Sequence, residues 1–145
     1  MRVVCQRVSQ ARVRVDGRMV DEIAEGLVIL LGVGRGDDGE QAARLAAKVA
    51  RLRVFPDAEG RFDRSVLDTG GAALVVSQFT LLADTAKGNR PSFSDAAPPD
   101  EAEPVYERFC EELEALGLPV GRGVFGAKME LELVNSGPVT IILDS

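Results

Sequence analysis

The segment Ser77-Gln78-Phe79-Thr80-Leu81 places hydroxyl and amide side chains directly after an apolar run that begins at Ala72. Polar groups that appear where a buried strand ends often form a site. The main-chain N–H groups there could donate to a carbonyl oxygen or to a developing oxyanion. The Thr80 hydroxyl is the obvious side-chain candidate, but the chain has no histidine to activate it as a nucleophile. These residues therefore favour positioning and polarisation by main-chain groups, with a supporting role for Thr80.

A second segment, Asn135-Ser136-Gly137-Pro138-Val139-Thr140, interrupts a strand-like pattern near the C-terminus. Glycine allows a backbone to approach a ligand closely, and an X-Pro bond is the peptide bond that most readily becomes cis. A rigid main-chain segment of this kind can test the shape of a ligand. In an arbitrary protein a Gly-Pro step is more often a turn, and a polar strand end is more often structural.

The composition excludes several kinds of chemistry. Without histidine, the chain cannot form a Ser-His-Asp triad or a zinc site built on imidazole. Its two cysteines, Cys5 and Cys110, are far apart in the sequence, and neither has a CxxC partner. That usage fits neither a disulfide framework nor a thiolate metal cluster, so we expect no metal and no cofactor.

The charge of the chain is negative and uneven. There are 17 basic and 23 acidic residues, and the formal net charge of −6 has the wrong sign for binding a long stretch of nucleic-acid backbone. Residues 1–20 nevertheless contain five arginines and one acidic residue, whereas residues 95–114 contain eight acidic residues and one arginine. The sequence is therefore compatible with a small basic surface, and the acidic run is read most simply as the outer face of a helix.

The length and hydropathy predict one domain. A chain of 145 residues with 46% hydrophobic residues is long enough to bury a core, and we assign residues 1–145 to a single domain. The longest apolar stretch, Gly26 to Gly34, is far shorter than the roughly 20 residues of a membrane-spanning helix. Arginines interrupt the N-terminal residues before an apolar region forms, so we expect no secretory signal and a cytoplasmic location.

Hydrophobic periodicity predicts both strands and helices. Period-two alternation and short apolar runs predict strands over residues 3–15, 18–23, 27–33, 72–76, 128–134 and 139–143. The first strand is expected to contain a bulge at residues 8–10, and Asp16-Gly17 is expected to form a hairpin turn. Helical spacing predicts helices over residues 39–53, after a capping-box pattern at Asp38 and Gln41, and from about Pro104 to Leu116.

These elements predict an α+β fold with a mostly antiparallel sheet or partly closed β-barrel and two main helices. The loop over residues 83–99, rich in Gly, Asn, Pro and Ser, is longer than compact domains usually contain without a functional reason. We expect this loop to flank a ligand cleft. The few aromatic residues and the many β-branched ones favour an exposed sheet face that pairs with a second copy, giving a homodimer.

Together, the two polar segments resemble the signatures of the bacterial D-aminoacyl-tRNA deacylases, SQFTL and NxGPxT, and neither carries a substitution here. The resemblance also runs through the opening VVCQRVSQARVRV, the strand GLVILLGV, the loop KGNRPSFSDA and the segment FGAKM, so it covers nearly the whole chain. It implies a metal-independent homodimer that hydrolyses the ester bond of D-aminoacyl-tRNA and also removes mischarged glycine.

The resemblance further implies how such a site works. The 2′-hydroxyl of the terminal adenosine takes part in the reaction, while the protein binds the ester mainly through main-chain groups. A segment with a cis Gly-Pro bond enters the partner subunit's site, where its carbonyls hold the α-amino group. In this arrangement the side chain of an L-amino acid would clash with the wall of the site. The residues that match the family's site around the ester are Ser77, Gln78, Phe79 and Thr80, and those beside the terminal adenine are Phe125 and Met129. Gly137 and Pro138 match the segment that excludes L-amino acids, and Arg7 matches the residue that supports the Pro138 carbonyl.

Two other functions remain open at this stage. The chain could be a non-enzymatic dimer that uses the Gly-Pro segment to bind a nucleotide end or a partner protein. It could also hydrolyse other small amino esters, in which case the tRNA end would not be needed. The basic residues that could meet acceptor-stem phosphates are Arg2, Arg12, Arg14, Lys87, Arg90 and Lys128.

Overall fold

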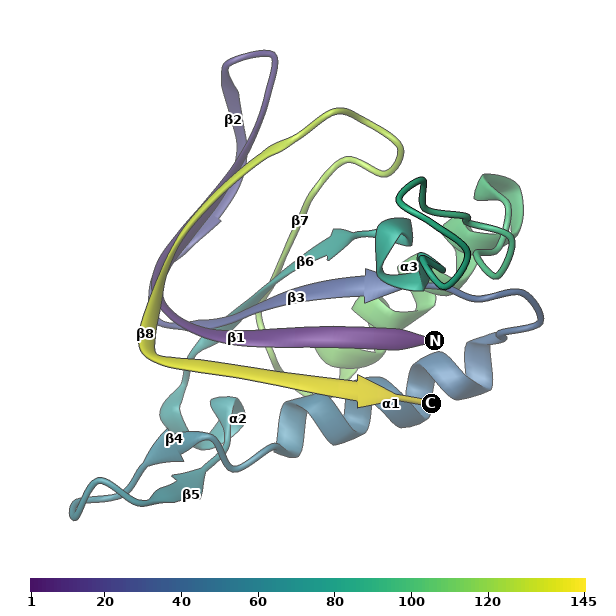
Figure 1. The fold of residues 1–145 in the computed structure, drawn as a ribbon. Helices are drawn as coiled ribbons and strands as arrows, with labels where there is room; N and C mark the ends of the chain where they lie inside the picture. The colour runs from purple at the N-terminus through teal and green to yellow at the C-terminus, as the bar shows by residue number, and fades with distance from the viewer.

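The first strand, β1 (Arg2–Val15), organises the fold in the computed structural model, which describes residues 1–145. Its first half pairs with β3 and its second half with β2, whereas β8 pairs with both halves. In Figure 1, β1 and β8 run side by side and bend together. The other strands of this main sheet are β2 (Arg18–Ile23), β3 (Gly26–Gly32), β6 (Ala72–Ser77), β7 (Val120–Arg122) and β8 (Glu130–Asp144).

The main sheet curls until its edges nearly meet. The three pairings made by β1 are antiparallel, whereas β3 pairs with β6, and β6 with β7, in parallel. Between β2 and β7, the Asp21 side chain accepts a hydrogen bond of 3.1 Å from the main-chain N–H of Arg122. The predicted α+β fold with a partly closed, mostly antiparallel sheet and two main helices is confirmed, and the parallel pairs are an addition to it.

Two long helices, α1 (Gly39–Arg51) and α3 (Pro99–Ala115), pack against the main sheet. The predicted start of α1 is confirmed, because Asp38 and Gln41 exchange the two capping-box hydrogen bonds, each 2.9 Å long. The predicted start of α3 near Pro104 is wrong. Pro99 occupies the first helical turn, where a missing N–H costs no hydrogen bond, and the helix continues through Pro104.

The remaining elements are short. They are the hairpin of β4 (Phe55–Pro56) and β5 (Phe62–Arg64), the single turn α2 (Val66–Thr69), and the 3₁₀ turn η1 (Phe79–Leu82) that follows β6. None of the helices is both long and apolar enough to span a membrane.

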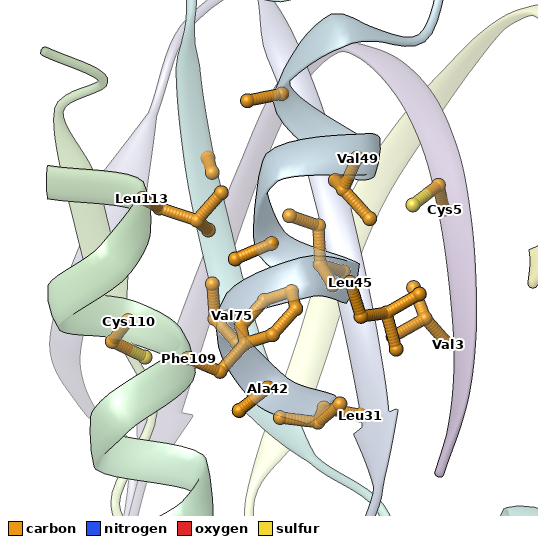
Figure 2. Packing of buried hydrophobic residues seen from close by; sticks show 14 of the residues in the cluster. Val3, Cys5, Leu31, Ala42, Leu45, Val49, Val75, Phe109, Cys110 and Leu113 are labelled. Atoms are coloured by element: carbon orange, nitrogen blue, oxygen red, sulfur yellow. The ribbon is translucent and has the colours of Figure 1, made fainter. Parts of the chain in front are cut away.

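The larger hydrophobic core lies between the sheet and the two long helices. It contains 25 buried residues, and Figure 2 shows side chains of α1 and α3 meeting those of β1, β3 and β6. Cys5 and Cys110 belong to this core, where burial raises the pKa of each thiol to about 12. A smaller cluster of five buried residues, Val8, Ala11, Val13, Val28 and Leu74, forms a second core.

The last strand, β8, is continuous, so the predicted division into two strands at Asn135 is wrong. The interruption takes the form of a bulge inside one strand. Because Asn135 pairs with Val8 and Thr140 with Gln6, residues 136–139 lie opposite Arg7 alone. We call residues 136–139 the β8 bulge. A second register shift lies between Val8 and Gln10 of β1, where the sequence predicted a bulge at residues 8–10.

Candidate active site

A cavity of about 610 Å³ lies beside the carboxyl end of β6, within the size range of small-molecule sites. Ser77, Gln78 and Phe79 line it, together with Phe125 and Met129. These five residues come from segments almost 50 positions apart in the sequence, 77–79 and 125–129. The fold therefore brings together five of the nine residues that the sequence singled out.

The turn η1 gives the SQFTL segment its shape. Main-chain hydrogen bonds from Gln78 N to Leu31 O (2.8 Å) and from Leu81 N to Gln78 O (3.2 Å) fold the chain back over β3. Gly32 makes this approach possible, since a Cβ there would lie 2.4 Å from a methyl carbon of Leu82. The first N–H groups of a helical turn have no acceptor inside the turn, which leaves those of Phe79 and Thr80 for other partners.

Thr80 differs from its neighbours in position. It is exposed and is not among the residues that line the cavity. Its hydroxyl accepts a hydrogen bond from the Gln78 side chain. Thr80 is therefore placed to hold Gln78, which does line the cavity.

A buried tyrosine supports the wall formed by Phe125. The ring of Tyr106, on α3, lies 5.8 Å from the ring of Phe125, and its hydroxyl donates to the Val75 carbonyl at 2.9 Å. Burial raises the pKa of the Tyr106 hydroxyl, so it stays a donor. Met129 packs close to Gly123, where a Cβ would lie 2.7 Å from the Met129 sulfur. An aromatic ring and a thioether thus stand at one side of the cavity.

The loop after η1 closes another side of the cavity. Phe93, Ala96, Ala97 and Pro98 all line it, so the long loop flanks a cleft as its length predicted. Phe93 packs edge to face with Phe79, with ring centroids 5.0 Å apart and an interplanar angle of 71°. Phe93 was not among the candidate site residues predicted from the sequence. Its place in a loop of unusual length was the signal that could have identified it.

Arg35 is the one ionisable residue in the cavity lining. Its Nε donates to the Ser94 carbonyl at 2.6 Å, and its main-chain N–H donates to the Asp95 carbonyl at 3.0 Å. The rest of the lining is apolar apart from Ser77, Gln78 and main-chain groups. Arg35 lies in no motif of the sequence that predicted a site.

The β8 bulge presents Gly137 and Pro138 on the surface, joined by a cis peptide bond. Gly137 has φ +136°, a conformation that side chains disfavour. A Cβ on Gly137 would lie 2.9 Å from Val139 Cγ2 and 3.0 Å from an Nη atom of Arg7. This position therefore accepts glycine and little else.

Arg7 and Asn135 hold the bulge. Arg7 donates to the carbonyls of Ser136 (2.9 Å) and Val54 (2.7 Å), so the expected contact with the Pro138 carbonyl is wrong within this chain. Within the β8 bulge, the carbonyl that faces the Arg7 side chain is that of Ser136. The Asn135 side chain accepts from Val139 N at 2.8 Å and donates to Val139 O at 3.3 Å.

The β8 bulge and the cavity are far apart in one chain. The bulge lies beside Arg7, which pairs with Leu27 of β3, whereas Ser77 pairs with Leu31. Four residues along a strand span about 13 Å, and the three strand spacings from β8 to β6 add about 14 Å across the sheet. Gly137, Pro138 and Arg7 consequently do not line the cavity of their own subunit.

Three of the six basic residues proposed for phosphate contact are engaged within the chain. Arg2 pairs with Asp144 at 2.8 Å, and Arg12 and Arg14 pair with Glu132 at 3.7 and 2.7 Å. The other three, Lys87, Arg90 and Lys128, form no ion pair. No three His, Cys, Asp or Glu side chains gather into a group that could hold a metal ion.

Fold and site together define an α+β protein with a largely apolar, ligand-sized cavity beside the end of a central strand. A family model described as D-Tyr-tRNA(Tyr) deacylase matches residues 4–144. A protein of Roseiflexus castenholzii (strain DSM 13941 / HLO8), named D-aminoacyl-tRNA deacylase, is 63% identical over 145 residues, which are 100% of this chain and 92% of the relative. A protein of the same name from Thermomicrobium roseum (strain ATCC 27502 / DSM 5159 / P-2) is 60% identical, and the match covers 100% of this chain and 94% of the relative.

The chain therefore belongs to the D-Tyr-tRNA(Tyr) deacylase family, and the resemblance found in the sequence is confirmed. A solved structure described as a c-Myc DNA Unwinding Element Binding Protein superimposes with a TM-score of 0.93 at 40% identity, covering 100% of this chain and 99% of the other. Another, described as a probable eukaryotic D-amino acid tRNA deacylase, has a TM-score of 0.84 at 17% identity, and the match covers 99% of this chain and 98% of the other. The latter likeness shows the fold alone.

Proposed function

We propose that this protein hydrolyses the ester bond of D-aminoacyl-tRNA, and of mischarged glycyl-tRNA, releasing the free amino acid and tRNA. Its family membership supports this activity, since its relatives are named for it. The observation that carries the proposal for the site is the meeting of Ser77, Gln78 and Phe79 with Phe125 and Met129 around one cavity. The ester lies against the first three residues and the terminal adenine against the last two. The protein acts in the cytoplasm as a check on translation.

Catalysis uses the RNA itself. The lining contains no carboxylate, thiol or phenol, and its one ionisable residue is an arginine, whose guanidinium donates hydrogen bonds and accepts none. Thr80 lies outside the lining and binds Gln78, which supports a positioning role. The 2′-hydroxyl of the terminal adenosine then takes part in opening the ester, while the main-chain N–H groups of Phe79 and Thr80 stabilise the developing oxyanion. One such donor contributes roughly 2.7–4 kcal/mol to a transition state.

The β8 bulge acts on a second copy of the chain. Gly137 and Pro138 are exposed and lie far from the cavity of their own subunit, so a homodimer is required to bring the two together. The Gly-Pro carbonyls bind the α-amino group, and the rigid bulge leaves no room for an L side chain. Selection then works by exclusion, which accepts many D-amino acids and also glycine.

Single-turnover hydrolysis of matched D- and L-aminoacyl-tRNA, with a chelator present, tests the activity directly. We expect rapid release from the D form and from glycyl-tRNA, and slow release from the L form. Equal or absent release, together with stoichiometric binding, would favour the alternative of a non-enzymatic nucleotide-binding dimer. Equal hydrolysis of a D-amino acid ester that lacks any RNA would favour a general amino-ester hydrolase.

Subunit complementation tests the shared site. A chain carrying Gly137→Ala has a damaged bulge, and a chain carrying Gln78→Ala has a damaged cavity. If the bulge serves the partner's cavity, a mixed dimer contains one site with both defects and one intact site. Mixing the two impaired variants should then restore up to about half of the wild-type activity per heterodimer. If the bulge served its own subunit, mixing would restore none.

A further inference from the structure

The loop after β3 places a charged side chain at the cavity without pairing it to an acid. Arg35 is the sole charged residue among the 17 that line the cavity. Its Nε donates to Ser94 O, and its own main-chain N–H donates to Asp95 O, so both side chain and backbone are fixed against the long loop. A guanidinium held through Nε keeps its two Nη groups free to donate elsewhere.

The acidic neighbours of Arg35 in sequence are already engaged. Asp37 binds the N-terminal ammonium group at 2.7 Å and accepts from Gly34 N at 2.6 Å. Asp38 caps α1 through its hydrogen bond with Gln41 N. Arg35 forms no ion pair with either of them or with any other acidic residue. The cavity therefore carries one uncompensated positive charge in an otherwise apolar lining, which favours a ligand with a negative group.

We propose that Arg35 binds the phosphodiester on the 5′ side of the terminal adenosine and so sets the position of the substrate's RNA end. The inference rests on the deacylase function proposed above. An amino acid esterified to RNA has no free carboxylate, and its α-amino group is cationic, so the phosphodiester is the anion nearest to the ester. The two Nη groups match its oxygens as a planar pair of donors. Arg35 is thus a specificity-determining residue for a nucleotide end over a bare nucleoside.

Binding of two small probes separates this contact from catalysis. Calorimetry would compare adenosine with adenosine 5′-methylphosphate, which adds a single phosphodiester charge, on the full-length protein. We expect the wild type to bind the phosphodiester probe about tenfold more tightly, a typical effect of one charge-assisted contact. Arg35→Ala should remove this preference and leave adenosine binding unchanged. Arg35→Lys should keep part of it, and Arg51→Ala, an exposed arginine on α1, should keep all of it.

Kinetics give a second measurement. Arg35→Ala should raise KM for D-aminoacyl-tRNA about tenfold with little change in kcat, and should leave the hydrolysis of 3′-O-D-aminoacyl-adenosine unaffected. The proposal is overturned if the wild type does not distinguish the two probes, or if Arg35→Ala weakens both equally, which would mean that Arg35 only shapes the loop. A wild type that prefers the phosphodiester probe but hydrolyses no D-aminoacyl-tRNA would refute the deacylase function and leave the anion contact standing.

Discussion

The cavity beside η1 and the β8 bulge are built in opposite ways. The cavity is a hollow lined mainly by side chains from several segments, with Phe79, Phe93 and Phe125 among them. The bulge is a projection of main chain whose tip, Gly137 and Pro138, is exposed. Hydrogen bonds that two side chains, Arg7 and Asn135, form with the main chain of the bulge fix its conformation. In the proposed function, the cavity receives the ligand and the partner's bulge presents a fixed backbone surface to it, so substitutions in the two regions should have different effects.

Gly137→Ala should have the largest effect on activity. The added Cβ meets Val139 Cγ2 at 2.9 Å and an Arg7 Nη atom at 3.0 Å, and φ +136° is strained for alanine, so the bulge must move. A misplacement of about 1 Å in a positioning group costs on the order of 100-fold in rate. Single-turnover rates on D-aminoacyl-tRNA check this. Ser136→Ala is the control, since Ser136 contributes only its carbonyl, and a Gly137→Ala rate equal to that of the control would contradict the role of the bulge.

Arg7→Lys should have the second-largest effect on activity, with about a tenfold lower rate. It should also lower the free energy of unfolding by about 1–2 kcal/mol. The guanidinium donates to Ser136 O and Val54 O through two different nitrogens, and one lysine ammonium cannot reproduce that geometry. Denaturant unfolding and the ratio of D to L hydrolysis measure the two effects. Arg18→Lys, an exposed arginine at the hairpin, should change neither. A variant that keeps full selectivity would show that Asn135 alone shapes the bulge.

Thr80→Ala should reduce the rate only a few-fold, roughly the effect of losing one hydrogen bond. Thr80 lies outside the cavity lining, and its hydroxyl serves to hold the Gln78 side chain. Gln78→Ala, which removes a side chain from the lining itself, should cost more. Loss of all turnover in Thr80→Ala with substrate binding intact would instead identify the Thr80 hydroxyl as a nucleophile.

Glu132→Gln should have the smallest effect, confined to stability. A hydrogen bond from Arg14 and the charge of Arg12 hold the pKa of Glu132 below its usual value. A carboxylate with a lowered pKa stabilises the fold above the pKa of the unfolded chain, and that contribution is lost as the pH falls through the lower, folded value. The variant should therefore melt slightly below wild type at pH 7 and together with it at pH 2. Activity at pH 7 should be unchanged, because these ion pairs hold only the first half of β8.

Local sequence patterns predicted the elements well where one physical cause dominates. Asp38 and Gln41 have both the spacing and the side chains of a capping box, and α1 begins there. The predicted start of α3 was wrong because Pro98, Pro99 and Pro104 all allow a helix start. The helix begins at Pro99 and already buries Ala102 against the core. The parallel pairing of strands depends on contacts between residues far apart in the sequence. Hydrophobic periodicity, which is a local pattern, carries no information about such contacts.

The candidate site was predictable where it lies in contiguous motifs. Ser77, Gln78 and Phe79 line the cavity as the SQFTL segment suggested, and the Gly137-Pro138 bond adopts the cis form that the resemblance implied. Arg7 was correctly linked to the Gly-Pro segment, but its acceptor is Ser136 O, because the four-residue bulge changes which carbonyl faces it. Arg35 and Phe93 come from loops, and only the folded chain shows that they share a cavity.

The reactivity of the two buried cysteines can be used to measure how fast the protein unfolds. Oxidants and disulfide reagents attack thiolates, and Cys5 and Cys110 are shielded in the core with pKa values of about 12. The native protein should need no reducing agent to stay active, and peroxide should leave both sulfurs intact. Labelling by a thiol reagent at pH 8 should then proceed only as fast as the fold opens. Its rate at high reagent concentration measures the lifetime of the native state, a quantity that equilibrium melting does not give.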